Sequence, residues 1–321
     1  MSNKDRFQEK VTPYLKQLSE TSDAVREMYY FDPEHEDIPA DTSRDILIEK
    51  QLTKTKGLVH KFPSRVLFLL SYTCAANCRF CERQDRVGVG LDKFGRLKEE
   101  DILNAVEYIA EHPEINEVIF SGGDPLTYPK GLLFAFKKLQ EINHVKILRI
   151  HTKFPVQYPE KTDFDLLQTL SEFNITTYFS IHINHPDELN DMTVPVLKKI
   201  RRMGYIMLCQ SVFLKGVNDD YEVLYELFRR LSEIGVRPYY IYHCQSIPTT
   251  SKFVMKIEKE VEIMTKLREN LSGVAFPQHV IDIQNTTGKV VVPTNHWTYI
   301  SDSVKDFLGN DINLSEYDRY S

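Results

Sequence analysis

Residues 66–81 read VLFLLSYTCAANCRFC, an apolar run followed at once by three cysteines. The apolar run has the length and composition of a buried strand. Cys74, Cys78 and Cys81 then fall within eight residues, on the loop that leaves this strand. We therefore expect the three thiols to converge on one site at the carboxyl end of a strand.

The same alternation of an apolar run and an amphipathic segment continues along the chain. The apolar runs are VLFLLSY, EVIFSG, VKILRIHT, TTYFSIHI, YIMLCQSVFL and RPYYIYHC, and segments with a helical period lie near residues 98–112, 128–141, 163–173, 187–203 and 219–234. Strands separated by helices pair in parallel, and six such units close most readily into a full or partial barrel. The predicted fold is α/β, a partial (α/β)6 barrel of the TIM type, and a doubly wound open sheet is the alternative.

Two flanking segments complete the expected organisation. Residues 1–60 are charged and partly helical in pattern, and the stretch FDPEHEDIPADTS predicts an irregular linker. We predict an N-terminal helical extension over residues 1–60, the barrel over 61–275, and a C-terminal segment over 276–321 that includes a hairpin.

The composition excludes several classes of protein. The 46 acidic and 40 basic residues give a net charge of -6, without a basic stripe to neutralise a phosphate backbone, so nucleic acid is not an expected partner. No apolar run has the length of a membrane span, and the start MSNKDRFQEK lacks the apolar stretch of a signal peptide. We expect a cytoplasmic protein without a membrane partner, in which clustered cysteines bind metal rather than form disulfides.

Three clustered cysteines are one ligand short of an ordinary metal centre. A structural zinc site closes its tetrahedron with a fourth Cys or His, and an iron–sulfur cluster normally takes four cysteines. Three thiolates on a [4Fe-4S] cluster would leave one iron open for a substrate or cofactor. Zinc, or three unrelated buried cysteines, are the alternatives. Cys209 and Cys244 lie in apolar runs and are predicted to be core residues.

The spacing C-x3-C-x2-C, with Phe80 before the last cysteine, resembles the signature of the radical S-adenosylmethionine (SAM) superfamily. Within it, the chain resembles the lysine 2,3-aminomutase family from about residue 57 to about 295. The segments that carry this resemblance are FPSRVLFLLSYTCAANCRFCERQ, VIFSGGDPL, ILRIHTKFPV, HINHPDEL, QSVFLKGVNDD, VRPYYIYHC and DIQNTTGKVVVP.

The resemblance implies an isomerase that moves the α-amino group of an L-amino acid to the β carbon. Such enzymes use a [4Fe-4S] cluster, SAM as the source of a 5′-deoxyadenosyl radical, and pyridoxal 5′-phosphate (PLP). A flavodoxin- or ferredoxin-type reductant is the implied electron donor, and a homo-oligomer is compatible with the sequence. In the motif SGGDP, adjacent glycines allow a close backbone approach to a ligand. The residues implied to contact the cofactors here are Ser121, Gly122, Gly123, Asp124, His182 and Gln210.

The resemblance implies that the C-terminal segment, residues 276–321, binds PLP and substrate. Three residues match the family's PLP site. Lys289 occupies the place of the lysine that forms a Schiff base with PLP, while Lys61 and Arg65 match two arginines that neutralise its phosphate. Lysine cannot make the bidentate fork of arginine, so the contact at Lys61 is expected to differ. The family's glycine run is replaced by Asn285-Thr286-Thr287-Gly288, so this loop must follow another backbone path.

The substrate site departs from the family at one position. Arg83 matches the arginine that pairs with the substrate carboxylate, and Asp282 matches one of two aspartates that bind the ammonium of lysine. Gln245 replaces the other aspartate, which weakens recognition of a cation. The expected substrate is therefore lysine or a related polar amino acid.

Three other functions stay open at this point. One is a radical SAM enzyme that works without PLP, and another is an aminomutase that acts on a lysine side chain of a protein. The third is a non-catalytic iron–sulfur or zinc scaffold.

Overall fold

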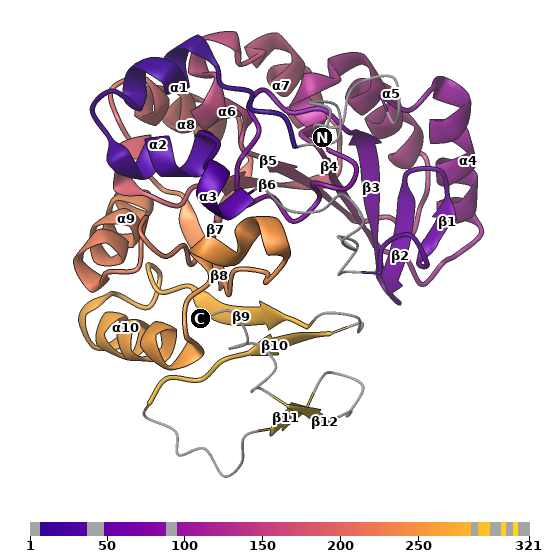
Figure 1. Ribbon diagram of the computed structural model, residues 1–321. Coiled ribbons are helices and arrows are strands. Elements are labelled where there is room, and N and C mark those ends of the chain that lie inside the picture. The colour runs from indigo at the N-terminus through magenta and orange to yellow at the C-terminus, as the bar shows by residue number, and fades with distance from the viewer. Residues whose placement is uncertain are drawn as a thin grey trace.

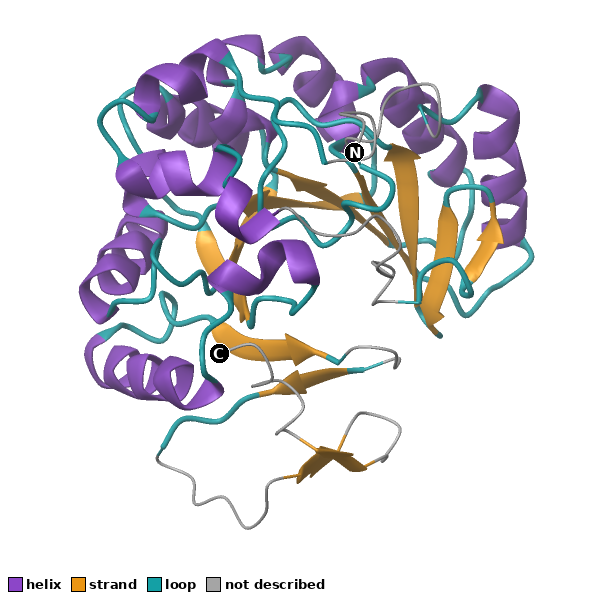
Figure 2. Cartoon of the chain, viewed as in Figure 1, coloured by secondary structure: helices purple, strands orange, loops and turns teal. Residues whose placement is uncertain are grey.

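A curved sheet of ten strands forms the interior of the protein, and helices cover its outer face (Figures 1 and 2). This is a computed structural model, which describes residues 7–36, 48–87, 95–283, 288–295, 303–305 and 311–313. In sheet order the strands are β1 (Thr53–Thr55), β2 (Leu58–Phe62), β3 (Arg65–Ser71), β4 (Glu117–Gly122), β5 (Ile147–Thr152), β6 (Thr176–His182), β7 (Ile206–Val212), β8 (Arg237–Tyr242), β9 (Gln278–Asp282) and β10 (Lys289–Val291). A separate pair is formed by β11 (Ser303–Lys305) and β12 (Asp311–Asn313).

The strands from β3 to β9 pair in parallel, and the outer pairs are antiparallel. One long helix connects each parallel strand to the next: α4 (Glu99–Ala110), α5 (Pro129–Leu139), α7 (Phe164–Ser171), α8 (Thr193–Arg202), α9 (Tyr221–Glu233) and α10 (Ile257–Asn270). The edge strands β1 and β10 do not pair with each other, so the sheet stays open. The predicted partial barrel is confirmed. The doubly wound alternative is wrong, because the helices that connect the parallel strands lie on one face of the sheet only (Figure 1).

Apolar periodicity explains these elements. Each strand from β3 to β8 contributes buried apolar side chains to one continuous core against the helices, from three in β3 to one in β8, and Phe68, Phe120, Phe179 and Ile241 are fully buried. The five helices predicted from periodicity are present, with ends a few residues inside the predicted ranges. The prediction missed α10 and the short strands β1 and β2, and β2 crosses the predicted boundary after residue 60. The division of the chain into three segments stays a prediction.

Three short helices precede the sheet: α1 (Pro13–Leu18), α2 (Asp23–Tyr29) and α3 (Pro33–Glu36). Side chains cap the first two, since the hydroxyls of Thr12 and Ser22 accept backbone N–H groups in their first turns. Apolar residues of α1 and α2 pack on Ala76 and Phe80 of the cysteine segment and on Phe253. The predicted extension is thus helical and covers the end of the barrel that carries the cysteines. The first part of the predicted irregular linker is wrong, because residues Pro33–Glu36 form α3, and its second part, residues 37–43, lies outside the described residues.

The predicted C-terminal hairpin is present as β9 and β10, and its register places Lys289 opposite Asp282. The replaced glycine positions Asn285, Thr286 and Thr287 lie outside the described residues. Within the described chain, no helix combines the length and the apolar character needed to span a bilayer.

Candidate active site

A cavity of about 490 Å³ lies at the carboxyl ends of the parallel strands. It is the place where active sites occur in barrels of this type, because the loops that follow the strands meet there. Every residue that the sequence proposed for a site lines this cavity: Lys61, Arg65, Cys74, Cys78, Cys81, Arg83, Ser121, Gly122, Gly123, Asp124, His182, Gln210, Gln245, Asp282 and Lys289. Their separate roles stay predictions.

The three cysteines border one wall of the cavity. Burial raises the pKa of the Cys78 thiol to about 11 and that of the Cys81 thiol to about 12. The side-chain amide of Gln157 donates to Cys78 Sγ at 3.3 Å. Among the described residues, no three Cys, His, Asp or Glu side chains converge tightly enough to hold one metal ion. A [4Fe-4S] cluster binds each thiolate through a different iron and so needs wider spacing, which three thiols on one cavity wall can fit.

Two glycines fix the segment that leads to the cysteines. A Cβ atom on Gly122 would lie 2.4 Å from the Ser71 carbonyl oxygen, and one on Gly123 would lie 2.3 Å from that of Thr73. Gly122 also has a φ of +113°, which favours glycine. The Gly123 N–H donates to the Ser71 carbonyl at 2.6 Å. The sequence assigned these glycines to a ligand, whereas the close approach that the structure shows is to the neighbouring chain segment.

Asp124 holds three segments together from beneath the cavity. Its carboxylate accepts the Thr152 hydroxyl at 2.8 Å and the backbone N–H groups of Lys153 at 2.8 Å, Phe154 at 2.9 Å and Leu126 at 3.0 Å. Its own N–H donates to the Thr73 carbonyl at 2.8 Å. Burial raises the pKa of Asp124, and the hydrogen bonds oppose that rise. The visible role of this carboxylate is to position the loops that carry the other residues.

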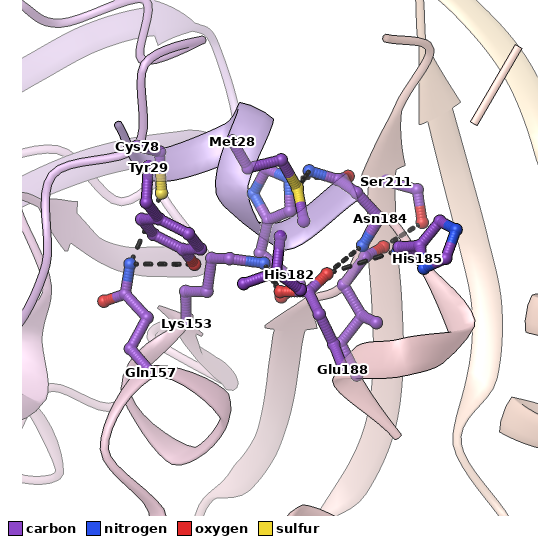
Figure 3. Close-up of polar contacts among 12 residues, drawn as sticks. Met28, Tyr29, Cys78, Lys153, Gln157, His182, Asn184, His185, Glu188 and Ser211 are labelled. Atoms are coloured by element: carbon purple, nitrogen blue, oxygen red, sulfur yellow. Dashed lines mark hydrogen bonds and ion pairs between the residues drawn. The ribbon is translucent and has the colours of Figure 1, made fainter. Parts of the chain in front are cut away.

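A buried polar network lies behind Cys78 (Figure 3). Lys153 forms an ion pair with Glu188 and donates to the His182 carbonyl at 3.1 Å. Glu188 also accepts the Asn184 N–H at 2.7 Å, and the Asn184 side-chain oxygen lies 3.1 Å from His182 Nε2. Burial, followed by the charge of Lys153, lowers the pKa of His182 to about 3, so this imidazole is neutral. Sequence reasoning missed Glu188, although it stands near the end of the motif HINHPDEL.

Arg83 is held by two carboxylates. Its Nη2 lies 2.6 Å from Glu49 Oε1 and its Nε lies 3.1 Å from Glu49 Oε2, while Nη1 lies 3.2 Å from Glu82. The Glu49 side chain is 5% exposed. The guanidinium therefore reaches the cavity with one edge fixed by Glu49, a partner that sequence reasoning missed because it is 34 residues away in the chain.

Lys289 and Lys61 share one carboxylate across the cavity. Asp282 lies 3.0 Å from Lys289 Nζ and 3.2 Å from Lys61 Nζ, and the Tyr242 hydroxyl accepts from Lys289 at 3.1 Å. Burial alone would lower the pKa of Lys289, but Asp282 and Tyr242 outweigh burial and raise it. The Gln245 side-chain amide donates to the Asp282 carbonyl at 2.6 Å. The two residues matched to the family's lysine-binding aspartates are thus in contact.

More cations than carboxylates line the cavity. The cations are Lys61, Arg65, Arg83, Arg149, Lys153 and Lys289, and the carboxylates are Glu49, Glu82, Glu117, Asp124 and Asp282, which leaves a surplus of one positive charge. Glu117 pairs with Arg149. The Arg65 guanidinium lies 3.9 Å from the centre of the Phe62 ring, and no ion pair with a carboxylate is found for it in the part of the chain that the structure describes. A cation without a carboxylate partner and a buried amine in one cavity fit a phosphate-bearing aldehyde such as PLP.

Comparison with known proteins decides the family. The model of the radical SAM superfamily matches residues 68–244. L-lysine 2,3-aminomutase from Haemophilus influenzae is 35% identical over 253 residues, which cover 78% of this chain and 73% of that protein. The chain belongs to the lysine 2,3-aminomutase family of radical SAM enzymes. The resemblance seen in the motifs is confirmed, and this family of isomerases implies a [4Fe-4S] cluster and SAM.

Other members of the aminomutase family match over similar stretches. L-lysine 2,3-aminomutase from Clostridium subterminale is 33% identical over 290 residues, which cover 89% of this chain and 69% of that protein. A relative from Aquifex aeolicus is 38% identical over 241 residues, 75% of this chain, and the match spans 64% of the relative's length. The superfamily match over residues 68–244 includes the three cysteines.

Proposed function

We propose that this protein is an amino-acid 2,3-aminomutase, which moves the α-amino group of a free L-amino acid to the β carbon. One observation carries the proposal. A single cavity is lined by the three cysteines and by a buried lysine within a surplus of positive charge. A radical SAM centre needs the first feature, and a PLP site needs the second. A flavodoxin- or ferredoxin-type protein is the proposed reductant.

The lining residues divide between the two groups. Cys74, Cys78 and Cys81 would hold the [4Fe-4S] cluster, and the segment from Ser121 to Asp124, with His182 and Gln210, would surround SAM. Lys289 would hold PLP, and Lys61 and Arg65 would neutralise its phosphate. When bound, the cluster with SAM supplies a radical that abstracts hydrogen, and PLP carries the amino nitrogen as it moves.

The chain's own contribution is to orient the substrate and to control one proton. Arg83, fixed by Glu49, would pair with the substrate carboxylate through its remaining N–H groups. Asp282 keeps Lys289 protonated, so Lys289 must give up a proton before it can bind PLP covalently. The Tyr242 hydroxyl, 3.1 Å away, stays as a hydrogen-bond partner of the nitrogen. The buried walls exclude water from the reacting atoms.

The ion pairs of Asp282 favour a second candidate. Because Lys61 and Lys289 both already have an ion-pair partner in this carboxylate, their ammonium groups are held in the cavity without PLP. A radical SAM enzyme that works without PLP would keep these two ion pairs of Asp282 during its reaction.

Reconstitution separates the two candidates. The protein is supplied anaerobically with iron, sulfide, SAM and PLP, then treated with borohydride and digested. We expect the phosphopyridoxyl label on Lys289, no label in Lys289→Ala, and full labelling in Lys54→Ala, a change in the exposed strand β1. A screen of L-amino acids should yield a β-amino acid product. SAM cleavage by a protein that gains no label on Lys289 would favour the PLP-free candidate.

A further inference from the structure

A buried glutamine donates a hydrogen bond to one of the three cysteines. Gln157 ends the short helix α6 (Phe154–Gln157) and is 1% exposed. Its Nε2 lies 3.3 Å from Cys78 Sγ (Figure 3) and 3.2 Å from the Ala76 carbonyl oxygen. In the part of the chain that the structure describes, no side chain donates to the sulfur of Cys74 or Cys81. This amide therefore distinguishes Cys78 from the other two cysteines.

The contacts of the amide fix its orientation. The Ala76 carbonyl can only accept, so it must face the nitrogen of the amide and not its oxygen. The amide nitrogen carries two hydrogens, so it can donate to the Ala76 carbonyl and to Cys78 Sγ at the same time. The Tyr29 hydroxyl oxygen lies 3.4 Å from the same nitrogen. Because sulfur is larger than oxygen, 3.3 Å to Cys78 is the closer of these two contacts.

The oxygen end of the amide has no partner. Gln157 Oε1 is buried, and none of the described residues donates to it. A buried acceptor without a hydrogen bond is costly, and an apolar side chain of the same size would avoid that cost. The amide therefore points to a role other than stability. Its dipole has the positive end at Cys78 and the negative end away from it.

The backbone around Gln157 is fixed from two sides. The Thr12 hydroxyl donates to the Gln157 carbonyl at 2.5 Å, and the Gln157 N–H donates to the Lys153 carbonyl at 3.0 Å. Lys153 in turn donates its own N–H to the Asp124 carboxylate at 2.8 Å. The fold thus sets the distance between the amide and Cys78.

The charged side chains near Cys78 oppose each other. Lys153 and Glu188 act most strongly on this sulfur, with opposite signs, and they form an ion pair. Their effects on the sulfur therefore compensate in large part. The hydrogen bond from Gln157 is a polar contact of Cys78 that no such partner offsets.

We propose that Gln157 raises the reduction potential of the [4Fe-4S] cluster by donating this N–H to the Cys78 thiolate. Reduction adds one electron, supplied by the flavodoxin- or ferredoxin-type reductant, and part of its charge resides on the ligand sulfurs. A donor to one sulfur binds more strongly in the reduced state, which favours reduction. Gln157 acts only through Cys78 and is thus a positioning residue. The inference rests on the part of the proposed function that assigns Cys78 to the cluster.

The reduction potential of the reconstituted protein tests this role. It is measured by a redox titration in which EPR follows the reduced cluster. Gln157→Met has a similar volume and no N–H donor. At one applied potential, we expect its ratio of reduced to oxidised cluster to be about threefold to tenfold lower than in the native protein. This corresponds to a potential lower by about 30–60 mV, at 59 mV per tenfold for one electron.

Gln84→Met is the matched control. Gln84 is also buried, its Nε2 donates to the Arg79 carbonyl at 2.9 Å in the same cysteine segment, and its Oε1 likewise has no partner among the described residues. It contacts no cysteine sulfur within the described chain, so the potential should stay that of the native protein. Loss of a buried amide alone would instead shift both variants equally, and that result would overturn the inference.

Two further measurements apply if Gln157→Met binds no cluster. Gln157→Asn keeps an amide but is one methylene shorter, so it should also lower the potential. In native protein with ¹⁵N in its glutamine side chains, pulsed EPR of the reduced cluster should detect a coupled ¹⁵N nucleus. An unchanged potential in Gln157→Asn, or no ¹⁵N coupling in the native protein, would overturn the inference.

The outcomes for the inference and for the proposed function are distinguishable. The expected shift in potential, found in a protein that yields no β-amino product, would support the inference and count against the proposed function. An aminomutase whose potential does not depend on Gln157 would do the opposite. A native protein that binds no [4Fe-4S] cluster would overturn both.

Discussion

Replacement of Asp124 by asparagine tests how much the hydrogen bonds of this carboxylate contribute to the stability of the protein. The new side chain would keep one acceptor oxygen and replace the other by an amide nitrogen. The better orientation keeps the oxygen on the N–H groups of Lys153 and Phe154, which face the same carboxylate atom. The amide nitrogen then faces the Leu126 N–H, which donates to the other carboxylate oxygen in the native protein and loses that acceptor.

The expected cost follows from these contacts. One buried donor left unpaired costs about 1–3 kcal/mol, and each retained bond changes from charged to neutral, a loss of about 1 kcal/mol. Asparagine is neutral, so the variant no longer has the cost of burying a charge, and this gain offsets part of the loss. We therefore expect Asp124→Asn to lower the free energy of unfolding by about 2–3 kcal/mol.

The assay is urea unfolding of the metal-free protein under reducing conditions, followed by circular dichroism. Asp163→Asn is the matched control, because Asp163 accepts one N–H at the start of α7, where asparagine caps a helix equally well. Its unfolding free energy should change by less than about 0.5 kcal/mol. Equal stabilities of the two variants would refute the account of Asp124.

Three further predictions concern the cysteines, a glycine and a histidine. Cys78→Ala should bind no [4Fe-4S] cluster after anaerobic reconstitution, whereas Cys209→Ala, a change in the core, should keep the cluster. The iron content and the visible absorbance of each variant measure the bound cluster. Gly123→Ala should destabilise the protein by about 2 kcal/mol because its Cβ meets a backbone oxygen, while Gly273→Ala, with open space around it, should have no such cost, as thermal melting will show. The pKa of His182 is lowered from 6.5 to about 3, so the unfolded chain binds a proton that the folded chain does not, and stability is lost as pH falls below 6.5. Between pH 7 and pH 5 the free energy of unfolding of the native protein should therefore fall by about 2 kcal/mol because of His182. The variant His182→Gln should lack this part of the fall. If the two proteins lose stability equally between these pH values, the prediction is wrong.

The fold was predictable where its signal is local. Each core strand is a short segment rich in apolar residues, and the helices between the strands repeat apolar residues at a helical period. Helix α10 was missed because Glu260 stands in its apolar stripe, among the buried residues Ile257, Val261 and Met264. That position is itself a signal, since a glutamate on the buried face of a helix needs a partner.

The residues of the site were predictable where they lie in the family motifs. The ion pairs between these residues and their partners were not predictable. The ion pair between Arg83 and Glu49 joins segments 34 residues apart, and the contacts of Glu260 with His243 and His279 join α10 to the end of β8 and to β9. Such contacts depend on how the barrel curves, which no pattern within one segment encodes. The pair of Lys289 with Asp282 is an intermediate case, because the register of a hairpin sets it.

The packing of the first helices has a consequence for the order of assembly during synthesis. α1 and α2 pack on Leu214, Val217 and Phe253, so part of their binding surface emerges from the ribosome roughly 220 residues after α2 itself. At about 5–20 residues per second, this delay is about 10–45 s. Ala76 and Phe80 belong to the same cluster, so the packing around the cysteine segment is complete only after Phe253 has been synthesised.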